Sequence, residues 1–399
     1  MLEASPEVAT GFDMWDVHQT GPDPHSLYRE MRGRCPVGHS AKHGGFTFTV
    51  DFATMNAVAV EPEMFSNNPG VIPPMHLERP MVPLMIDPPE HRPFRRVLNP
   101  FFTVARLTSL EADMRRFCAE LCNEFAARGE CDAVQEYAAV IPMYTLSKFF
   151  QVPEELRPSF VDWASSMVHD VQSDPTAAAA AGANLAGAIT GLLAQRREQP
   201  REGDLLSELA TGVLGGVALT PEDIMDICLV MVLAGADTTQ HAIANSLRLL
   251  AERPDLRRRL CAEPDLMESA IEEFLRYDGP VQFTARRVTV SNTVAGPSLE
   301  VGDNVALVWA AGNRDSAVFE HPDEVVLDRN PNRHVAFGTG IHRCLGANLA
   351  KLEMRVALEE FLAVIPDFHA TDDLTEPEKW VTGIVRGPKI LPLRSGNPG

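Results

Sequence analysis

Near its C-terminus the chain reads Phe337-Gly338-Thr339-Gly340-Ile341-His342-Arg343-Cys344-Leu345-Gly346. The glycines on either side of Thr339 let the backbone approach a flat ligand closely, and the phenylalanine ring is suited to cover its face. Two basic residues stand directly before the cysteine, and the helix expected to follow points its amide groups at the sulfur, so we expect a lowered thiol pKa. The segment therefore predicts a cysteine thiolate bound to haem iron. A buried structural cysteine at the start of a helix is the alternative.

This loop resembles the haem-ligand segment of the cytochrome P450 family. The resemblance implies that Cys344 is the iron ligand and that Phe337, Gly338, His342 and Gly346 contact a haem b, which is iron protoporphyrin IX. A thiolate ligand donates electron density to iron, which favours O–O bond cleavage over reversible oxygen storage. The family's fold is implied as well: mainly α with small β-sheets (α+β), with one long central helix over the haem.

The composition indicates one large soluble unit. The chain has 399 residues, 45% of them apolar, and no Gly- or Ser-rich linker divides it. We therefore expect a single domain over residues 1–399, with residues 1–22 as an N-terminal extension. Neither a signal peptide nor about twenty uninterrupted apolar residues is present, so we expect no membrane span. Seven cysteines without a regular spacing fit a cytoplasmic protein, and a formal charge of -20 argues against nucleic acid as a partner.

Hydrophobic periodicity places the chain in a mainly helical class. Amphipathic helices are expected over residues 107–127, 134–150 and 178–197. Strands are expected over residues 45–50, 288–295 and 301–309, which are rich in apolar and β-branched side chains.

A longer helix is predicted to begin at Thr220, a capping residue followed by proline and two acids, and to run to about residue 251. At 1.5 Å per residue it would be roughly 48 Å long. Its middle reads Ala234-Gly235-Ala236-Asp237-Thr238-Thr239, where the glycine and hydroxyl groups favour a local bend. A polar patch on a solvated face is the alternative. The resemblance implies that Ala234 lies against the haem, that Thr238 supports oxygen activation and that Asp237 gates proton delivery.

Basic residues that could bind the two haem propionates occur in three segments. Residues 87–91 open a helix in which His91 and Arg95 share one face. Cations fix carboxylates well. The resemblance implies that these two residues bind the propionates together with His342 and Arg286, although the neighbouring Arg287 leaves that register open. A helix-terminal cluster facing water is the alternative for each residue.

A structural ion pair is the interpretation of Glu273 and Arg276, which lie three residues apart on an expected helix. On spacing alone this pair predicts a solvated salt bridge. The resemblance implies instead a buried network with Arg329 as its third member and with His334 as a further candidate.

The resemblance implies a haem-thiolate monooxygenase that inserts one atom of O2 into a C–H bond. Positions that line the family's substrate pocket fall on Met81, Val230, Leu233, Gln282 and Ile384. Most pocket positions are aliphatic, which predicts a small lipophilic substrate, with a terpenoid-like skeleton favoured. Arg79 is the exception, because it would pair either with a substrate carboxylate or with Glu78 or water. A carboxylate-bearing aromatic or fatty acid and a larger biosynthetic scaffold therefore stay open as substrates.

Electrons are expected from a separate ferredoxin and its reductase, because the sequence contains neither a flavin nor a ferredoxin segment and resembles the soluble bacterial type. A small acidic partner needs a basic patch near the thiolate. The candidates for it are Arg95, Arg96, Arg115, Arg116, Arg343 and Lys351. Two other classes stay open. Asp237 and Thr238 argue against a peroxygenase driven by hydrogen peroxide, and a noncatalytic haem protein would leave residues 235–238 unexplained.

Overall fold

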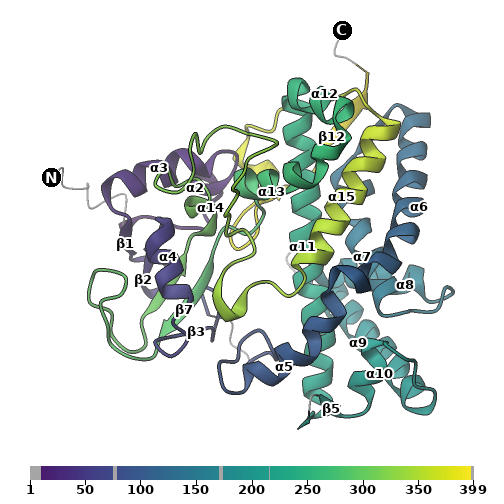
Figure 1. The fold of residues 1–399 in the computed structure, drawn as a ribbon, viewed down its shortest axis with the longest axis horizontal. Coiled ribbons are helices and arrows are strands. Elements are labelled where there is room, and N and C mark those ends of the chain that lie inside the picture. Colours follow the sequence, from purple (N-terminus) through teal and green to yellow (C-terminus); the bar gives the residue numbers. More distant parts are fainter. Residues whose placement is uncertain (1–9, 75–78, 170–173, 215, 397–399) are drawn as a thin grey trace.

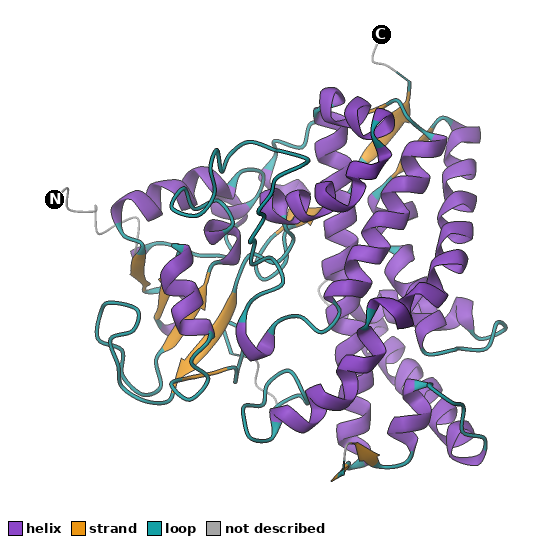
Figure 2. Ribbon diagram, viewed as in Figure 1, coloured by secondary structure: helices purple, strands orange, loops and turns teal. Residues whose placement is uncertain are grey.

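The protein is described by a computed structural model covering residues 10–74, 79–169, 174–214 and 216–396. Figures 1 and 2 show a helical half, drawn on the right, and a smaller half on the left that carries the main sheet. The helices are α2 Val17–Thr20, α3 Pro24–Arg34, α4 Phe52–Ala59, α5 His91–Leu98, α6 Val104–Arg128, α7 Val140–Phe149, α8 Arg157–His169, α9 Pro175–Glu198, α10 Leu205–Ala210, α11 Pro221–Glu252, α12 Pro254–Ala262, α13 Met267–Asp278, α14 Trp309–Gly312 and α15 Ala347–Val364.

The strands are short. They are β1 Val37–Ser40, β2 Phe46–Thr49, β3 Phe65–Ser66, β4 Glu130–Asp132, β5 Val213–Leu214, β6 Val217–Ala218, β7 Thr284–Val288, β8 Asn304–Leu307, β9 Phe368–Ala370, β10 Trp380–Val381, β11 Gly387–Pro388 and β12 Pro392–Ser395. The largest sheet has the order β1-β2-β8-β7-β3, in which only β2 and β8 are parallel. The expected class, mainly α with small sheets, is confirmed.

Helix α11 forms the centre of the helical half (Figure 1). Its predicted start is confirmed, because the Thr220 side chain accepts a hydrogen bond from the N–H of Asp223 while the Asp223 carboxylate accepts one from the N–H of Thr220. The helix continues without interruption to Glu252, so Gly235 does not break it. It packs against α7, α13 and α15, and buried side chains from these helices form the main hydrophobic core. The hydrophobic effect thus fixes the helix whose middle faces the candidate site.

Two of the expected elements differ from the structure. The strand expected over residues 288–295 is wrong, since β7 occupies Thr284–Val288 instead. Beyond Val288 the Asn292 side chain accepts a hydrogen bond from the N–H of Val294 and donates one to the carbonyl of Val290, and such local bonds compete with strand pairing. The helix expected over residues 134–150 is divided into a π-helical turn, Val134–Ala138, and α7.

The sequence has no run of about twenty uninterrupted apolar residues, as expected, but two described helices are long and apolar enough on average to be candidate membrane spans. Among the described residues, these helices are α9 and α11, and they are candidates by length and composition only. Helix α11 is the core helix of the fold, however, and 61% of its most apolar window is buried inside the protein. Its hydrophobicity is therefore explained by packing against other helices.

Candidate active site

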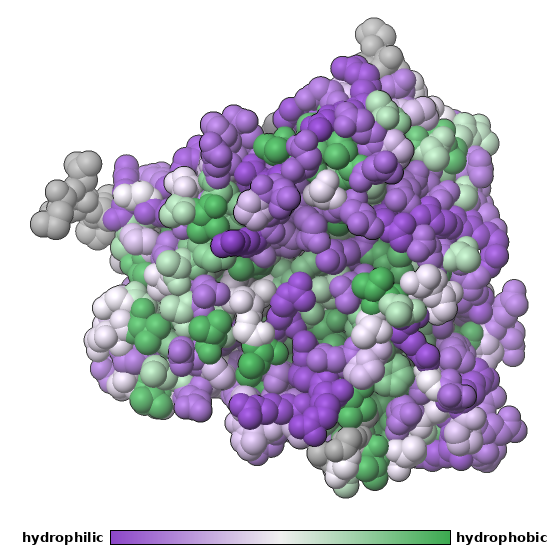
Figure 3. All heavy atoms as spheres, in the orientation of Figure 1, coloured by the Kyte–Doolittle hydropathy of each residue, from purple (hydrophilic) through white to green (hydrophobic). Residues whose placement is uncertain are grey.

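The middle of α11 faces an open space, called the hollow below, beside Leu233 and Ala234. Val232 and Ala236 are buried in the core, yet Leu233, only one residue from Val232, is 40% exposed, and Ala234 is exposed beside it. A large apolar side chain exposed in the middle of a core helix indicates a space that a ligand fills. Figure 3 shows a recess between the sheet-bearing half and the helical half, partly lined by apolar residues. Leu233 and Ala234 are thus exposed on the part of α11 that carries Asp237 and Thr238.

Cys344 lies in the loop directly before α15, and its residue surface is exposed. Its N–H donates a hydrogen bond to the carbonyl of Phe337, 2.9 Å away, which closes the loop. Gly340 has a φ of +73°, and a Cβ there would stand 2.6 Å from the carbonyl oxygen of Ala59, so only glycine fits. The loop is therefore held against α4 by a close backbone contact.

The thiol pKa differs from the expectation. Although the residue surface is exposed, the protein atoms packed around the thiol partly desolvate it and raise the pKa of Cys344, while the N–H of Gly346 and the charges of Arg95 and Arg343 act in the opposite direction. The basic residues are placed as predicted, but in the protein alone they do not outweigh desolvation. A bound metal cation would supply the missing stabilisation of the thiolate.

The predicted propionate ligands form a group of basic side chains that have few anionic partners. Arg286 is 4% exposed, whereas Arg287 is exposed, which identifies the inward-facing arginine of β7. In the described part of the chain no carboxylate forms an ion pair with Arg286, whose guanidinium donates to the carbonyl of Ala285. Burial lowers the pKa of Arg286 to about 10. A buried guanidinium of this kind is unfavourable unless an anion is bound beside it.

Two histidines extend this group. The rings of His91 and His342 lie 4.3 Å apart between centroids, and burial together with the neighbouring His342 lowers the pKa of His91 to about 4. The Nε2 atom of His342 is buried without a hydrogen-bond partner in the described structure, and Asp87 lies 3.6 Å from it. Arg95 donates to the carbonyl of Arg343, 2.9 Å away, which joins α5 to the cysteine loop. Together these residues fit the two carboxylates of a haem beside Cys344.

The two candidate catalytic residues lie on consecutive positions of α11 and are half-buried. The hydroxyl of Thr238 donates to the carbonyl of Ala234 at 2.7 Å. Oδ1 of Asp237 lies 3.2 Å from Nε2 of His241, a buried residue one turn further along. Sequence analysis did not single out His241, although its spacing of four residues from Asp237 was visible on the expected helix.

A second residue missed by sequence analysis is Glu353 on α15, which is 2% exposed. Burial raises the pKa of Glu353 to about 8, and the side chains of Thr145 and Thr239 lower it to a smaller extent. The signal was an acid on the apolar face of a predicted helix. Because Thr239 follows Thr238 directly, the Glu353 carboxyl group lies close to the candidate catalytic residues.

The candidate pocket residues differ in their exposure. Leu233 is exposed on α11, and Met81, Val230 and Ile384 are half-buried. Gln282 is 2% exposed, and its side-chain amide donates to the carbonyl of Gly279, so it serves the core instead of a pocket wall. The N–H of Gln282 donates to the carbonyl of Ile384, which fixes that residue beside the main sheet.

Arg79 has two partners that were not predicted from the sequence. Its guanidinium contacts Asp223 at 2.9 Å and Asp226 at 2.5 Å in the first turns of α11, while Glu78 lies outside the described residues. Asp226 precedes Leu233 by seven residues, or about 10 Å along the helix. Arg79 therefore forms ion pairs with two acids of this chain, and these acids lie away from the exposed middle of α11.

The ion pair of Glu273 and Arg276 is fully buried, so the solvated salt bridge predicted from spacing is wrong. The Arg276 guanidinium donates twice to the Glu273 carboxylate, at 2.7 and 2.8 Å, and Arg329 adds a contact of 3.0 Å. Arg276 also donates to the carbonyls of Asn313 and Pro322. His334 does not bind Glu273 but pairs with Glu272 at 2.6 Å. The network ties α13 to the segment that leads into the cysteine loop.

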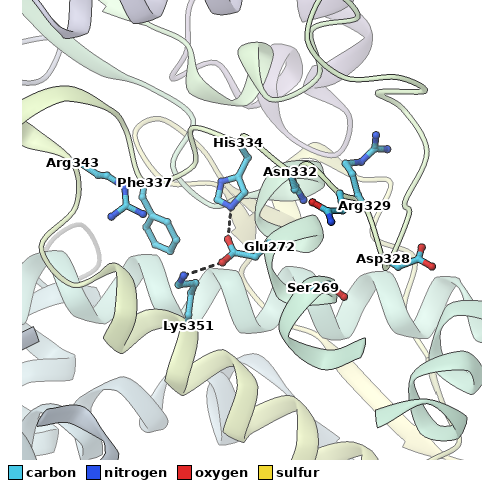
Figure 4. A pocket seen from close by; sticks show the side chains of 10 residues that line it. Ser269, Glu272, Asp328, Arg329, Asn332, His334, Phe337, Arg343 and Lys351 are labelled. Carbon is cyan, nitrogen blue, oxygen red and sulfur yellow. Dashed lines mark hydrogen bonds and ion pairs between the residues drawn. The ribbon is translucent and has the colours of Figure 1, made fainter. Parts of the chain in front are cut away.

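A polar cavity of about 550 Å³ adjoins the cysteine loop (Figure 4). Phe337 and Arg343 of the loop line it together with Ser269, Glu272, Asp328, Arg329, Asn330, Asn332, His334 and Lys351. Glu272 lies between His334 and Lys351, and although burial acts to raise its pKa, these two partners lower it to about 2. The cavity is therefore lined by charges of both signs next to the cysteine.

Three of the six residues of the predicted basic patch, Arg115, Arg116 and Lys351, form ion pairs with acids. Arg115 pairs with Glu111, Glu359 and Glu360, and Arg116 pairs with Asp113. Arg343 is exposed and lies over the ring of Phe337, 6.0 Å from its centroid. The positive surface beside the loop is thus smaller than the sequence predicts, because acids from distant segments compensate it.

Comparisons with known proteins agree with this site. The family model for cytochrome P450 matches residues 143–389. The vitamin D(3) 25-hydroxylase of Pseudonocardia autotrophica is 32% identical and is aligned over 94% of each chain. The steroid C26-monooxygenase of Mycolicibacterium smegmatis is also 32% identical, over 92% of this chain and 91% of the relative. A crystal structure of CYP109E1 from Bacillus megaterium in complex with corticosterone superposes with a TM-score of 0.82 at 28% identity, covering 94% of this chain and 98% of that one.

Identity above 30% over nearly the whole of both chains is accompanied here by the same fold. The cysteine loop, the long helix and the buried Glu-Arg pair stand in the structure as the resemblance implied. The chain therefore belongs to the cytochrome P450 family and is an oxidoreductase, a haem-binding monooxygenase.

Proposed function

We propose that the enzyme hydroxylates an unactivated C–H bond of a lipophilic substrate at a haem b whose iron is bound by Cys344. The observation that carries the proposal is the group of basic side chains beside this cysteine, in which Arg286 is buried without an ion-pair partner among the described residues. When bound, thiolate-ligated haem uses two electrons and two protons to place one atom of O2 in the substrate and to release the other as water.

The haem would be held by residues from four segments. Cys344 provides the iron ligand, and the propionates are bound by His91, Arg95, Arg286 and His342. Ala234 of α11 and Phe337, Gly338 and Gly346 of the cysteine loop would contact the haem. This assignment gives the buried Arg286 guanidinium a counter-charge, which is favourable because no carboxylate among the described residues forms an ion pair with it.

Asp237 and Thr238 would handle the protons. Asp237 is half-buried, so its carboxylate has access both to water and to the interior. The Thr238 hydroxyl donates its own hydrogen to the carbonyl of Ala234, which leaves its oxygen lone pairs to accept a hydrogen bond from a group in the hollow. A carboxylate that exchanges protons with water and a fixed hydroxyl that accepts a hydrogen bond beside it are suited to general acid-base transfer.

A steroid or another terpenoid-derived ring system is the proposed substrate. The relatives named above act on vitamin D(3) and steroids, and one of the solved structures binds corticosterone. The exposed Leu233 adds an apolar contact at the hollow. A carboxylate substrate is disfavoured, because the Arg79 guanidinium already contacts two acids among the described residues, Asp223 and Asp226.

Electrons would come from a ferredoxin and its reductase in the cytoplasm, with residues 1–399 acting as one catalytic domain. The proposed docking surface is the wall of the polar cavity formed by Arg343 and Lys351 (Figure 4). An acidic group of the partner could pair with the exposed Arg343, whereas Lys351 already contacts Glu272 at 2.9 Å. Attraction of this kind raises the association rate and weakens with salt.

Two measurements test the proposal. Titration of the ferric holoenzyme with corticosterone, testosterone, limonene, lauric acid and benzoic acid should give a low-to-high-spin shift with the neutral compounds and not with the acids. The reduced carbon monoxide complex should show the thiolate spectrum, and Cys344→His should abolish it. A thiolate spectrum that survives the substitution would disprove the ligand assignment, and a shift with acids alone would reverse the substrate assignment.

A further inference from the structure

A buried histidine that has no part in the steps above lies one turn beyond Asp237 on α11. The side chain of His241 is 2% exposed, and its Nε2 atom lies 3.2 Å from Oδ1 of Asp237. Residues four apart share a helix face, so the contact belongs to α11 itself and does not depend on a loop. It joins a fully buried ring to a carboxylate whose side chain is 27% exposed.

The surroundings of the ring determine which nitrogen carries its hydrogen. The Nδ1 atom of His241 is buried and has no hydrogen-bond partner in the part of the chain that the structure describes. An N–H at Nδ1 would be a buried donor without an acceptor, which is unfavourable by roughly 1–3 kcal/mol. The hydrogen therefore belongs on Nε2, the atom that faces the Asp237 carboxylate.

The ring is also fixed in place by the backbone of β11. A Cβ atom added at Gly387 would stand 2.2 Å from Nδ1 and 2.6 Å from Cγ of His241, so the ring fills the space that a side chain would need. Gly387 follows Ile384 by three residues, and Ile384 is bonded to the backbone of Gln282. His241 thus sits between the proton-handling part of α11 and the segment that carries a proposed pocket residue.

We propose that His241 is a positioning residue, whose Nε2–H holds the Asp237 carboxylate where it can pass protons toward Thr238. This inference rests on the proposed role of Asp237. Proton transfer requires hydrogen-bond reach between donor and acceptor, and a displacement of about 1 Å can cost on the order of a hundredfold in rate. Without the contact the carboxylate loses the buried N–H donor on its own helix that orients it. Electrons from NADH are then lost to hydrogen peroxide, which forms from O2, two electrons and two protons.

The first test needs no turnover. In the ferrous carbon monoxide form, which is diamagnetic, ¹H–¹⁵N correlation spectra report the tautomer of each histidine ring. We expect His241 to be protonated on Nε2 alone, and its signals should be assigned by their loss in His241→Gln. A hydrogen on Nδ1 alone would overturn the proposal, because Nε2 would then have no hydrogen to donate to Asp237.

The second test compares variants during turnover with ferredoxin, reductase and NADH, using whichever of corticosterone and limonene gives the larger spin-state shift. His241→Leu keeps the bulk and removes the donor, so the ratio of product to hydrogen peroxide should fall about tenfold. His241→Gln returns an N–H near the same place and should stay within about twofold of the wild type. Gln240→Leu is the control, since it removes a neighbouring buried polar group from α11 and should leave the ratio of product to hydrogen peroxide unchanged.

The outcomes separate this inference from the proposed function. If Asp237→Asn lowers the product ratio while His241→Leu does not, His241 has no positioning role and the function of Asp237 stands. If Asp237→Asn has no effect, the proton role of Asp237 itself is wrong. If His241→Gln lowers the ratio of product to hydrogen peroxide as much as His241→Leu does, the ring does more than donate a hydrogen bond, and the positioning role is refuted.

Discussion

Glu353→Gln should change how the stability of the protein depends on pH. The Glu353 side chain is buried among α7, α11 and α15, and desolvation raises its pKa from 4.5 to about 8. Between pH 4.5 and about pH 8 the Glu353 carboxyl keeps its proton in the folded protein and loses it in the unfolded chain. The free energy of unfolding contributed by this group is therefore fully present below pH 4.5, decreases as the pH rises, and is lost above about pH 8.

The magnitude follows from the size of the shift. Each pH unit inside the window corresponds to about 1.4 kcal/mol, so raising the pH from about 5.5 to about 8 should cost the wild type roughly 3 kcal/mol through Glu353 alone. Glutamine has nearly the same shape, keeps hydrogen-bonding capacity toward Thr145 and Thr239, and does not titrate. The difference in stability between the variant and the wild type should therefore grow by that amount over this range.

Urea unfolding of both holoproteins, followed by circular dichroism at several pH values, measures this difference, because all other titrating groups are common to both. Glu320→Gln serves as the control for the loss of one carboxylate, since the Glu320 side chain is 90% exposed. If the wild-type and Glu353→Gln profiles run parallel from about pH 5.5 to about 8, Glu353 is not a buried proton-holding group and the reasoning fails.

Three further results are expected. Thr238→Ala removes the hydroxyl beside the hollow and should divert NADH electrons to hydrogen peroxide on the order of tenfold more often, measured as peroxide per NADH; unchanged partition would remove the proton role of Thr238. Arg286→Leu should release haem to apomyoglobin faster than Arg286→Lys, because only the lysine can still pair with a propionate, and equal release rates would contradict that contact. Gly340→Ala should lower the free energy of unfolding by more than about 1 kcal/mol, since its Cβ would meet the carbonyl of Ala59 at a positive φ, and urea curves matching the wild type would contradict this contact.

Sequence reasoning succeeded where structure is determined by neighbours along the chain. The start of α11 follows from Thr220, Pro221 and Asp223, all within one turn, and the cysteine loop follows from its glycines. It failed where distant segments meet. The burial of the Glu273 and Arg276 pair depends on carbonyls of residues 313–324, and no periodicity in α13 reveals them.

The ion pairs that neutralise surface cations were also not predicted from the sequence. Arg115 appears as a free cation in the sequence, yet acids from α15 neutralise it across about 245 residues of chain, and Arg79 similarly finds its acids on α11. The choice between Arg286 and Arg287 required knowing which face of β7 points inward. Side-chain direction in a strand alternates, so a shift of one residue decides the assignment.

The buried network of Glu273, Arg276 and Arg329 has a consequence for how the enzyme acquires its cofactor. Every bond in it joins protein groups, and it fastens the segment that leads into the cysteine loop to α13. The polypeptide itself thus maintains the shape of the loop. Haem entering this protein would meet a cysteine already in position, and its binding free energy would not be reduced by the entropy of ordering the loop.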